Sequence, residues 1–169
     1  MSFPTAAWRD DEATFTANLA DPTLSFAALV FAFYGDKLVL AEIPGRGWCI
    51  PSGRIESGES AEDAARREAF EEAGVTLGRI VSLGHFVLTD KATGKIRHAP
   101  TFIADVQGLE EVPPESESTG RLLVNLEDIA GLYYSWDDLL AAVFEEAAAE
   151  RERLLPSGLA ISELIAQPD

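Results

Sequence analysis

The chain contains little cysteine and little positive charge, and each shortage excludes a class of structure or of binding partner. Cys49 is the single cysteine among 169 residues, so an intramolecular disulfide is excluded. Lysine and arginine total 13 against 29 aspartate and glutamate residues, which gives a formal net charge of -16. Because nucleic-acid polymers and anionic membranes are bound through basic surfaces, we expect neither as a partner.

Long apolar segments are also missing, and no run is long enough to span a bilayer. The N-terminus lacks the charged-then-apolar pattern of a signal peptide, so a cytoplasmic location is expected. Hydrophobic residues still make up 47% of the chain, enough to bury the core of one domain. We assign this domain to residues 23–155, between a weakly patterned N-terminal arm (1–22) and a C-terminal tail (156–169). Such arms could become ordered by contact with another subunit, which makes a homodimer one hypothesis.

The order of apolar runs and turn signals predicts strands paired as hairpins, with one helix between them and one after. A nearly continuous apolar run over residues 24–34 indicates a strand buried on both faces, and residues 37–43 return as its hairpin partner. The later elements follow in order: a helix over about 61–73, strands near 80–88 and 96–106 with Pro100 at an edge or bulge, an acidic, proline-bearing loop over 110–120, a short strand over 121–126, and a helix capped by Ser135. This order predicts the α/β class, with a mixed sheet covered by helices.

One loop-helix segment concentrates carboxylates at fixed offsets. Residues 53–59 read Gly-Arg-Ile-Glu-Ser-Gly-Glu, and after a gap of seven residues 67–75 read Arg-Glu-Ala-Phe-Glu-Glu-Ala-Gly-Val. On a helix, Glu68, Glu71 and Glu72 fall within one arc of the surface and repel one another unless a cation lies between them. Mg²⁺ and Mn²⁺ take carboxylate oxygens together with substrate phosphates. The segment therefore predicts a divalent metal site.

A glutamate-rich helix is more often a solvated face with ordinary ion pairs, so the neighbouring residues decide between the two interpretations. The loop before the helix contains Gly53 and Gly58 and is too glycine-rich to have been selected for stability. Ser60, with Asp63 three residues later, predicts an N-cap, and Gly74 predicts the C-terminal stop. Loop and helix are therefore expected to form one site.

The segment resembles the Nudix box, the signature of the Nudix hydrolases. The family pattern is glycine, five residues, glutamate, seven residues, and then Arg-Glu-apolar-any-Glu-Glu-any-Gly-apolar. All seven invariant positions are filled, by Gly53, Glu59, Arg67, Glu68, Glu71, Glu72 and Gly74. The resemblance covers residues 53–75 and implies an α/β/α sandwich with the box helix on one face. It also implies a pyrophosphohydrolase, which cleaves a phosphoanhydride of a nucleoside diphosphate linked to another moiety.

The resemblance implies a role for each matching residue. Glu68, Glu71 and Glu72 would bind the metal, with the backbone carbonyl of Ser52 as a further ligand. Arg67 would orient the glutamates, and Glu59 would pair with Arg67 or support the metal shell. Family members take the general base either from the box or from a glutamate on a later loop, where Glu117 and Glu115 are the candidates.

Substrate contacts lie outside the box, and the sequence indicates them only by residue type. Arg46, Arg54 and Arg97 could contact phosphate, and the aromatic residues that could stack on a base are Trp48, Tyr133, Tyr134 and Trp136. Residues 89–93 carry neither the proline typical of the ADP-ribose branch nor the tyrosine typical of the dinucleoside polyphosphate branch. We therefore expect a small nucleoside diphosphate derivative without assigning it further.

Two other interpretations stay open at this point. The chain could be a non-catalytic Nudix-like domain that senses a nucleotide or binds a partner protein, although such domains usually lose box glutamates. It could also be an isomerase relative that uses cysteine and glutamate on isoprenoid diphosphates. The position of Cys49, just before the box loop in a predicted core strand, gives that alternative little support.

Overall fold

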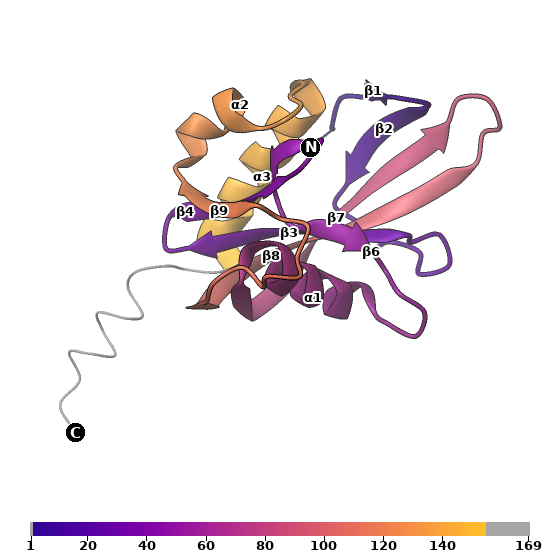
Figure 1. Cartoon of the computed structure of the whole chain (residues 1–169). Helices are drawn as coiled ribbons and strands as arrows, with labels where there is room; N and C mark the ends of the chain where they lie inside the picture. Colours follow the sequence, from indigo (N-terminus) through magenta and orange to yellow (C-terminus); the bar gives the residue numbers. More distant parts are fainter. Residues whose placement is uncertain (1, 155–169) are drawn as a thin grey trace.

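The computed structural model of the protein describes residues 2–154. Within these residues the strands form one mixed nine-stranded sheet (Figure 1). The strands are β1 (Ala6–Trp8), β2 (Asp11–Thr16), β3 (Ala27–Tyr34), β4 (Lys37–Ile43), β5 (Gly47–Cys49), β6 (Ser52–Arg54), β7 (Val75–Asp90), β8 (Ile96–Leu109) and β9 (Gly120–Val124). The helical elements are α1 (Ala61–Ala73), a 3-10 turn (Leu126–Asp128), α2 (Ile129–Leu132) and α3 (Asp138–Leu154).

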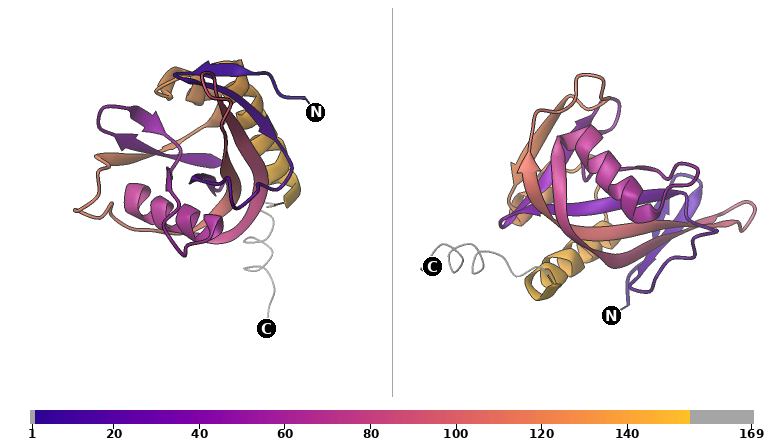
Figure 2. Two further views of the ribbon diagram at one scale, coloured as in Figure 1. Left: turned by 90° about the vertical axis from the view of Figure 1, so that its right-hand side faces the viewer. Right: turned by 90° about the horizontal axis from the view of Figure 1, so that it is seen from below.

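The sheet runs in the order β1-β2-β7-β8-β3-β4-β5, with β6 paired to β3 and β9 paired to β4. β3 and β8 are parallel, and the other paired strands are antiparallel. α1 covers one face of the sheet and α3 covers the other (Figure 2). The predicted α/β/α sandwich with a mixed sheet is therefore confirmed.

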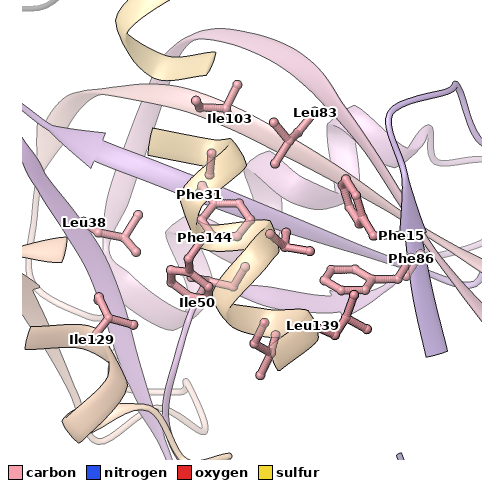
Figure 3. Packing of buried hydrophobic residues seen from close by; sticks show 14 of the residues in the cluster. Phe15, Phe31, Leu38, Ile50, Leu83, Phe86, Ile103, Ile129, Leu139 and Phe144 are labelled. Carbon is pink, nitrogen blue, oxygen red and sulfur yellow. The ribbon is translucent and has the colours of Figure 1, made fainter. Parts of the chain in front are cut away.

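Alternate residues of the central strands supply two separate cores, because side chains on a strand point to opposite faces in turn. On β3, Phe31 and Phe33 belong to the core beside α3, whereas Val30 and Ala32 belong to the core beside α1. In the α3-side core, Phe144 packs edge-on against Phe31 with ring centroids 4.9 Å apart (Figure 3). The α1-side core contains much smaller side chains, including the fully buried helix residues Ala64, Ala65, Ala69 and Ala73.

The box helix has the bounds and caps that its sequence predicts. The Ser60 side chain accepts a hydrogen bond from the Asp63 backbone N–H at 3.0 Å. Gly74 ends the helix with φ of 66°, in the left-handed region where glycine carries no steric penalty. Pro100 lies opposite His85, next to a register shift between Ser82 and Gly84, so the expected bulge is present.

Two expectations need correction. Residues 6–16 do not form an arm: they make β1 and β2, and β2 pairs with β7 from Asp11 to Thr16. This strand was missed because its core face consists only of Ala13 and Phe15. Ser135 does not cap the last helix; α3 begins at Asp138, and the Asp137 carboxylate accepts the Leu140 N–H at 2.8 Å.

The predicted tail over residues 156–169 lies outside the described residues. Among residues 2–154, no helix combines the length and the apolar character needed to cross a membrane.

Candidate active site

The short strand β6 lies between the box helix on one face of the sheet and a cavity on the other face. β6 pairs with β3 so that Gly53 lies opposite Ala28, which faces α1, while Ser52 and Arg54 lie opposite Leu29 and Ala27. A Cβ on Gly53 would lie 2.1 Å from Oε1 of Glu68, so only glycine leaves room for this carboxylate. Ser52 and Arg54 alternate with Gly53 and line a cavity on the other side.

Arg67 is the centre of the polar network on α1. Its guanidinium donates to both carboxylate oxygens of Glu59, from Nε at 2.7 Å and from Nη2 at 3.0 Å. Nη1 donates to Glu68 at 2.7 Å and to Glu71 at 3.3 Å. Nη2 also donates to the backbone carbonyl of Arg54 at 2.9 Å, which ties the loop to the helix. The hydrogen bonds from Arg67 lower the pKa of Glu59, and those to Glu59 and Glu68 raise the pKa of Arg67 itself.

Glu72 lies in a different environment from the other box glutamates. Its Oε1 accepts the Ser52 backbone N–H at 2.7 Å, which brings the Ser52 backbone against the helix. Burial raises the pKa of Glu72 to about 7 despite this hydrogen bond, and the negative charges of Glu68 and Glu117 act in the same direction. Burial also raises the pKa of Glu68, against the opposing effect of Arg67. For both carboxyls on α1, the cost of burying the charged form thus outweighs the hydrogen bond that the carboxylate accepts.

The three predicted metal ligands lie on one helix but do not converge. Glu68 and Glu71 turn toward Arg67, while Glu72 turns toward Ser52. Within residues 2–154, no group of three or more histidine, cysteine, aspartate or glutamate side chains is gathered in metal-binding geometry. The sequence therefore predicted which carboxylates share this surface, but their present orientations follow the hydrogen-bond donors around them.

The acidic loop between β8 and β9 lies beside the end of α1 (Figure 1). Glu115 and Glu117 are both exposed on it. The negative charge of Glu117 contributes to the raised pKa of Glu72, after the larger effects of burial and of Glu68. Of the two candidates for a loop base, Glu117 is the one whose charge contributes to the raised pKa of a box glutamate.

Two adjoining cavities open beside β6 on the α3 side of the sheet. The smaller, of about 310 Å³, is lined by Ser52, Gly53 and Arg54, and the larger, of about 680 Å³, extends toward α3. They share a largely apolar wall made of Trp8, Phe26, Leu29, Phe86 and Leu88, together with Arg46. A concave pocket lined by apolar and aromatic side chains, with a few polar groups among them, is the usual form of a small-molecule site.

The predicted substrate residues divide between this pocket and other parts of the fold. Arg46 lines both cavities and Arg54 the smaller one, whereas Arg97 pairs with Asp11 at 2.8 Å and lies over the Phe26 ring. Trp48 lies outside the lining of both cavities. The other predicted aromatics, Tyr133, Tyr134 and Trp136, line the larger cavity.

Trp8 and Asp137 are pocket residues that the sequence did not indicate. The indole Nε1 of Trp8 donates to Asp137 at 2.7 Å, so the first strand and the last helix meet in the wall of the cavity. Trp8 was overlooked because β1 is only three residues long and has no apolar alternation. Asp137 could have been identified as a helix cap, but its partner lies 129 residues away in the chain.

The remaining nucleophile and histidine candidates serve the fold. Cys49 is 2% exposed on β5, and burial raises the pKa of its thiol, so it is poorly suited to attack a substrate. His98 accepts the Asp21 backbone N–H at 3.1 Å through Nδ1 and stacks on His85. It is therefore a satisfied structural histidine.

Comparison with known proteins gives one consistent result. The family model described as "NUDIX domain" matches residues 22–155. A putative 8-oxo-dGTP diphosphatase, YtkD, of Bacillus subtilis (strain 168) is 32% identical over 94 residues, covering 56% of this chain and 58% of the relative. Nudix hydrolase 21, chloroplastic, of Arabidopsis thaliana is 38% identical over 91 residues, covering 54% of this chain and 46% of the relative. The chain thus spans about half the length of the curated relatives that it matches.

Solved structures agree on the fold. The pyrophosphohydrolase BsRppH of Bacillus subtilis superposes with a TM-score of 0.70 at 23% identity, over 83% of this chain and 92% of that one. At this identity the likeness concerns the fold alone, whereas the family model covers most of the chain, including the complete loop-helix signature. The protein therefore belongs to the NUDIX domain family.

Proposed function

We propose that the protein is a metal-dependent pyrophosphohydrolase that cleaves a phosphoanhydride of a nucleoside diphosphate linked to another moiety. The observation that carries this proposal is the position of β6, with box glutamates on one side and an aromatic cavity on the other. Gly53 adjoins Glu68, while Ser52 and Arg54 line the cavity. A diphosphate bound at β6 would therefore lie between the carboxylates and a nucleoside pocket.

The donor set at this position fits a divalent cation. Burial raises the pKa of both Glu68 and Glu72. The negative charge of Glu71 raises the pKa of Glu68 further, and that of Glu68 raises the pKa of Glu72 further. Such groups gain most from a nearby hard cation, which favours their ionised forms. We propose Glu68, Glu71 and Glu72 as ligands of Mg²⁺ or Mn²⁺, with the Ser52 carbonyl as a further ligand and Glu59 in support through Arg67. The cation would stabilise charge on the diphosphate and lower the pKa of the attacking water.

The residues of the chain would divide the remaining tasks. Arg67 holds Glu59 and Glu68 through three hydrogen bonds, and we propose that it thereby limits the positions that these carboxylates can take around the metal. Arg46, which lines both cavities, would neutralise phosphate charge. The aromatic wall would exclude water from the nucleoside.

The general base is proposed to be Glu117, whose carboxylate would accept the proton of the attacking water. It is exposed and therefore able to approach a bound substrate. Glu68 and Glu71 of the box are the alternatives, and the pH dependence of a Glu117→Gln variant distinguishes them. A shifted acidic limb in the pH profile supports Glu117.

The substrate class follows from pocket size and charge. The wall of the pocket is aromatic and the chain carries a formal charge of -16, so a short nucleotide fits better than a long anionic polymer. The name of the relative from Bacillus subtilis, a putative 8-oxo-dGTP diphosphatase, supports a nucleotide substrate. A cytoplasmic location and a homodimer stay predictions from the sequence.

The test is hydrolysis of a substrate panel with Mg²⁺ and with Mn²⁺, measuring released phosphate and pyrophosphate. The panel should contain nucleoside triphosphates, nucleotide sugars, ADP-ribose, dinucleoside polyphosphates and capped RNA. We expect turnover of a small nucleotide and its loss in chelator. Nucleotide binding without turnover of any member would instead identify a nucleotide sensor, and a clear preference for RNA would overturn the charge argument.

A further inference from the structure

The acidic loop, defined here as residues 110–119, begins against the C-terminal end of the box helix. The backbone N–H of Glu110 donates to the carbonyl of Gly74 at 2.8 Å. A Cβ on Gly74 would lie 2.5 Å from the Glu110 carbonyl oxygen and 2.8 Å from that of Glu111. Since both atoms belong to backbone, the contact leaves no room for a larger residue. The first turn of the loop is therefore packed directly on the helix end.

Arg121, the second residue of β9, reaches back to the same point. Its Nη1 donates to the Ala73 carbonyl at 2.7 Å and to the Glu110 carbonyl at 2.5 Å. α1 has no basic residue in its own last turn, so Arg121 supplies the positive charge that a helix C-terminus favours. One guanidinium thus joins the end of the helix, the start of the loop and the strand that follows the loop.

The other end of the acidic loop is held separately, by β4. The Thr119 backbone N–H donates to the Glu42 carbonyl at 2.9 Å, and the Thr119 hydroxyl donates to the Glu42 carboxylate at 2.8 Å. Between the two anchors the loop makes short local contacts, such as Ser116 N–H to the Pro113 carbonyl at 3.0 Å. Glu117 therefore lies in the unanchored part, two residues before Thr119.

We propose that Arg121 is a positioning residue that fixes the acidic loop, and with it Glu117, relative to the last turn of α1. That turn carries Glu71 and Glu72, so the position of the loop sets the distance between its carboxylate and the box carboxylates. The inference rests on the proposed function for its catalytic consequence. Arg121 itself acts through backbone carbonyls at the loop base.

A matched control exists on the same helix. Arg66 also donates to two backbone carbonyls, those of Leu77 at 2.8 Å and Gly78 at 3.1 Å, but these belong to β7 and not to the acidic loop. Arg66→Met and Arg121→Met therefore remove the same kind of interaction, from the link between α1 and β7 in the first case and from the link between α1 and the acidic loop in the second. Their thermal midpoints identify any loss that is due to stability alone.

The kinetic test compares both variants with the unsubstituted protein on its best substrate. We expect Arg121→Met to lower kcat on the order of 10- to 100-fold with KM changed by less than about threefold, because a displaced base impairs the chemical step. Arg121→Lys should recover part of kcat, since an ammonium can still donate to one carbonyl. Adding Glu117→Gln to Arg121→Met should lower kcat little further, because both changes remove the same function. Equal losses in the Arg66 and Arg121 variants, or fully additive losses in the double variant, would overturn the proposal.

A second readout needs no activity. In a Glu-specific protease digest, we expect Arg121→Met to speed cleavage after Glu115 and Glu117 about tenfold, because the two hydrogen bonds that join the loop base at Glu110 to the helix end at Ala73 are lost. Arg66→Met should leave this rate unchanged. Faster loop cleavage together with no turnover of any substrate by the unsubstituted protein would refute the proposed function while supporting the anchoring. An unchanged cleavage rate in Arg121→Met would refute the anchoring itself.

Discussion

The two faces of the sheet are packed by side chains of different size. More than half of the buried residues beside α1 are alanines, whereas every buried phenylalanine among residues 2–154 belongs to the core beside α3. Small side chains let a helix approach a sheet closely, and this approach brings Glu68 over Gly53. Large rings cannot fill the opposite face completely, and a cavity of about 680 Å³ opens there.

In the proposed function, this difference would separate chemistry from binding. The carboxylates lie on the closely packed α1 side, and the aromatic wall of the pocket lies on the α3 side, with β6 between them. We therefore expect substitutions on the α1 side to lower kcat and substitutions on the α3 side to raise KM. The four predictions that follow test this division.

The largest effect is expected for Glu72→Gln, on the α1 side. Replacing the carboxylate by an amide removes a proposed metal ligand, so kcat should fall on the order of 10²- to 10³-fold. Thermal stability without metal should hold or rise, because the substitution removes a buried charge. Steady-state kinetics at saturating Mg²⁺ and thermal unfolding in chelator measure the two effects.

Glu62→Gln is the control for this variant. Glu62 lies on the same helix but is half exposed and forms an ion pair with Arg66 at 3.8 Å, so neither kcat nor stability should change much. Near-normal turnover by a folded Glu72→Gln protein would remove Glu72 from the metal site.

A smaller loss is expected for Gly53→Ala, which tests the close approach of helix and loop. The added methyl group would lie 2.1 Å from Oε1 and 2.2 Å from Cδ of Glu68, so this side chain must rotate away from its place beside Arg67. We expect kcat to fall on the order of 10- to 100-fold, the effect of a misplaced group. The comparison is Gly131→Ala in α2, where an added Cβ meets nothing within 4 Å. Equal kcat values for the two variants would contradict the steric argument.

The α1 side was predictable from the sequence because its information is local. The helix bounds follow from Ser60 and Gly74, and the glutamate spacing places the carboxylates on one arc. Their actual orientations were not predictable, since they depend on donors such as the Ser52 N–H in the preceding strand.

The α3 side was predicted only in part, because its pocket is assembled from distant segments: Arg46, Tyr133, Tyr134 and Trp136 line the larger cavity as residue type indicated, but other wall residues had no signal. Trp8 on β1 and Asp137 before α3 meet across the cavity wall, yet neither lies in a recognisable pattern. Residue type alone predicts Arg97 and Trp48 as substrate contacts, and the structure places both outside the lining of the two cavities. Residue type indicates what a pocket needs, whereas strand pairing decides which residues supply it.

A third prediction concerns the pH dependence of stability, which we expect to be set on the α1 side by Glu72. Burial raises the folded-state pKa of Glu72 from 4.5 to about 7, so the folded protein keeps a proton that the unfolded chain loses. The protonated Glu72 carboxyl therefore makes its full contribution to folded-state stability below about pH 4.5, and this contribution is lost as the pH rises through 7. Without metal, this carboxyl should lower the free energy of unfolding on the order of 1–3 kcal/mol between pH 5 and 8.

Urea unfolding in chelator at both pH values measures the effect, with Glu72→Gln as the reference because glutamine does not titrate. If both proteins lose the same stability over this range, the buried carboxyl is not the cause. Added Mg²⁺ should reverse the trend in the unsubstituted protein, because metal binding favours the ionised carboxylate.

The smallest effect is expected on the α3 side, for Trp8→Phe. The substitution keeps an aromatic ring in the cavity wall but removes the indole N–H that donates to Asp137 at 2.7 Å. Loss of this hydrogen bond loosens the wall without touching the box carboxylates, so KM should rise about three- to tenfold while kcat stays within about twofold. Trp48→Phe is the matched control, because Trp48 packs against the same core but lines neither cavity. A rise in KM for Trp48→Phe alone would restore the sequence-based assignment of Trp48 to the substrate, and a fall in kcat for Trp8→Phe would show that the two faces do not divide binding from chemistry.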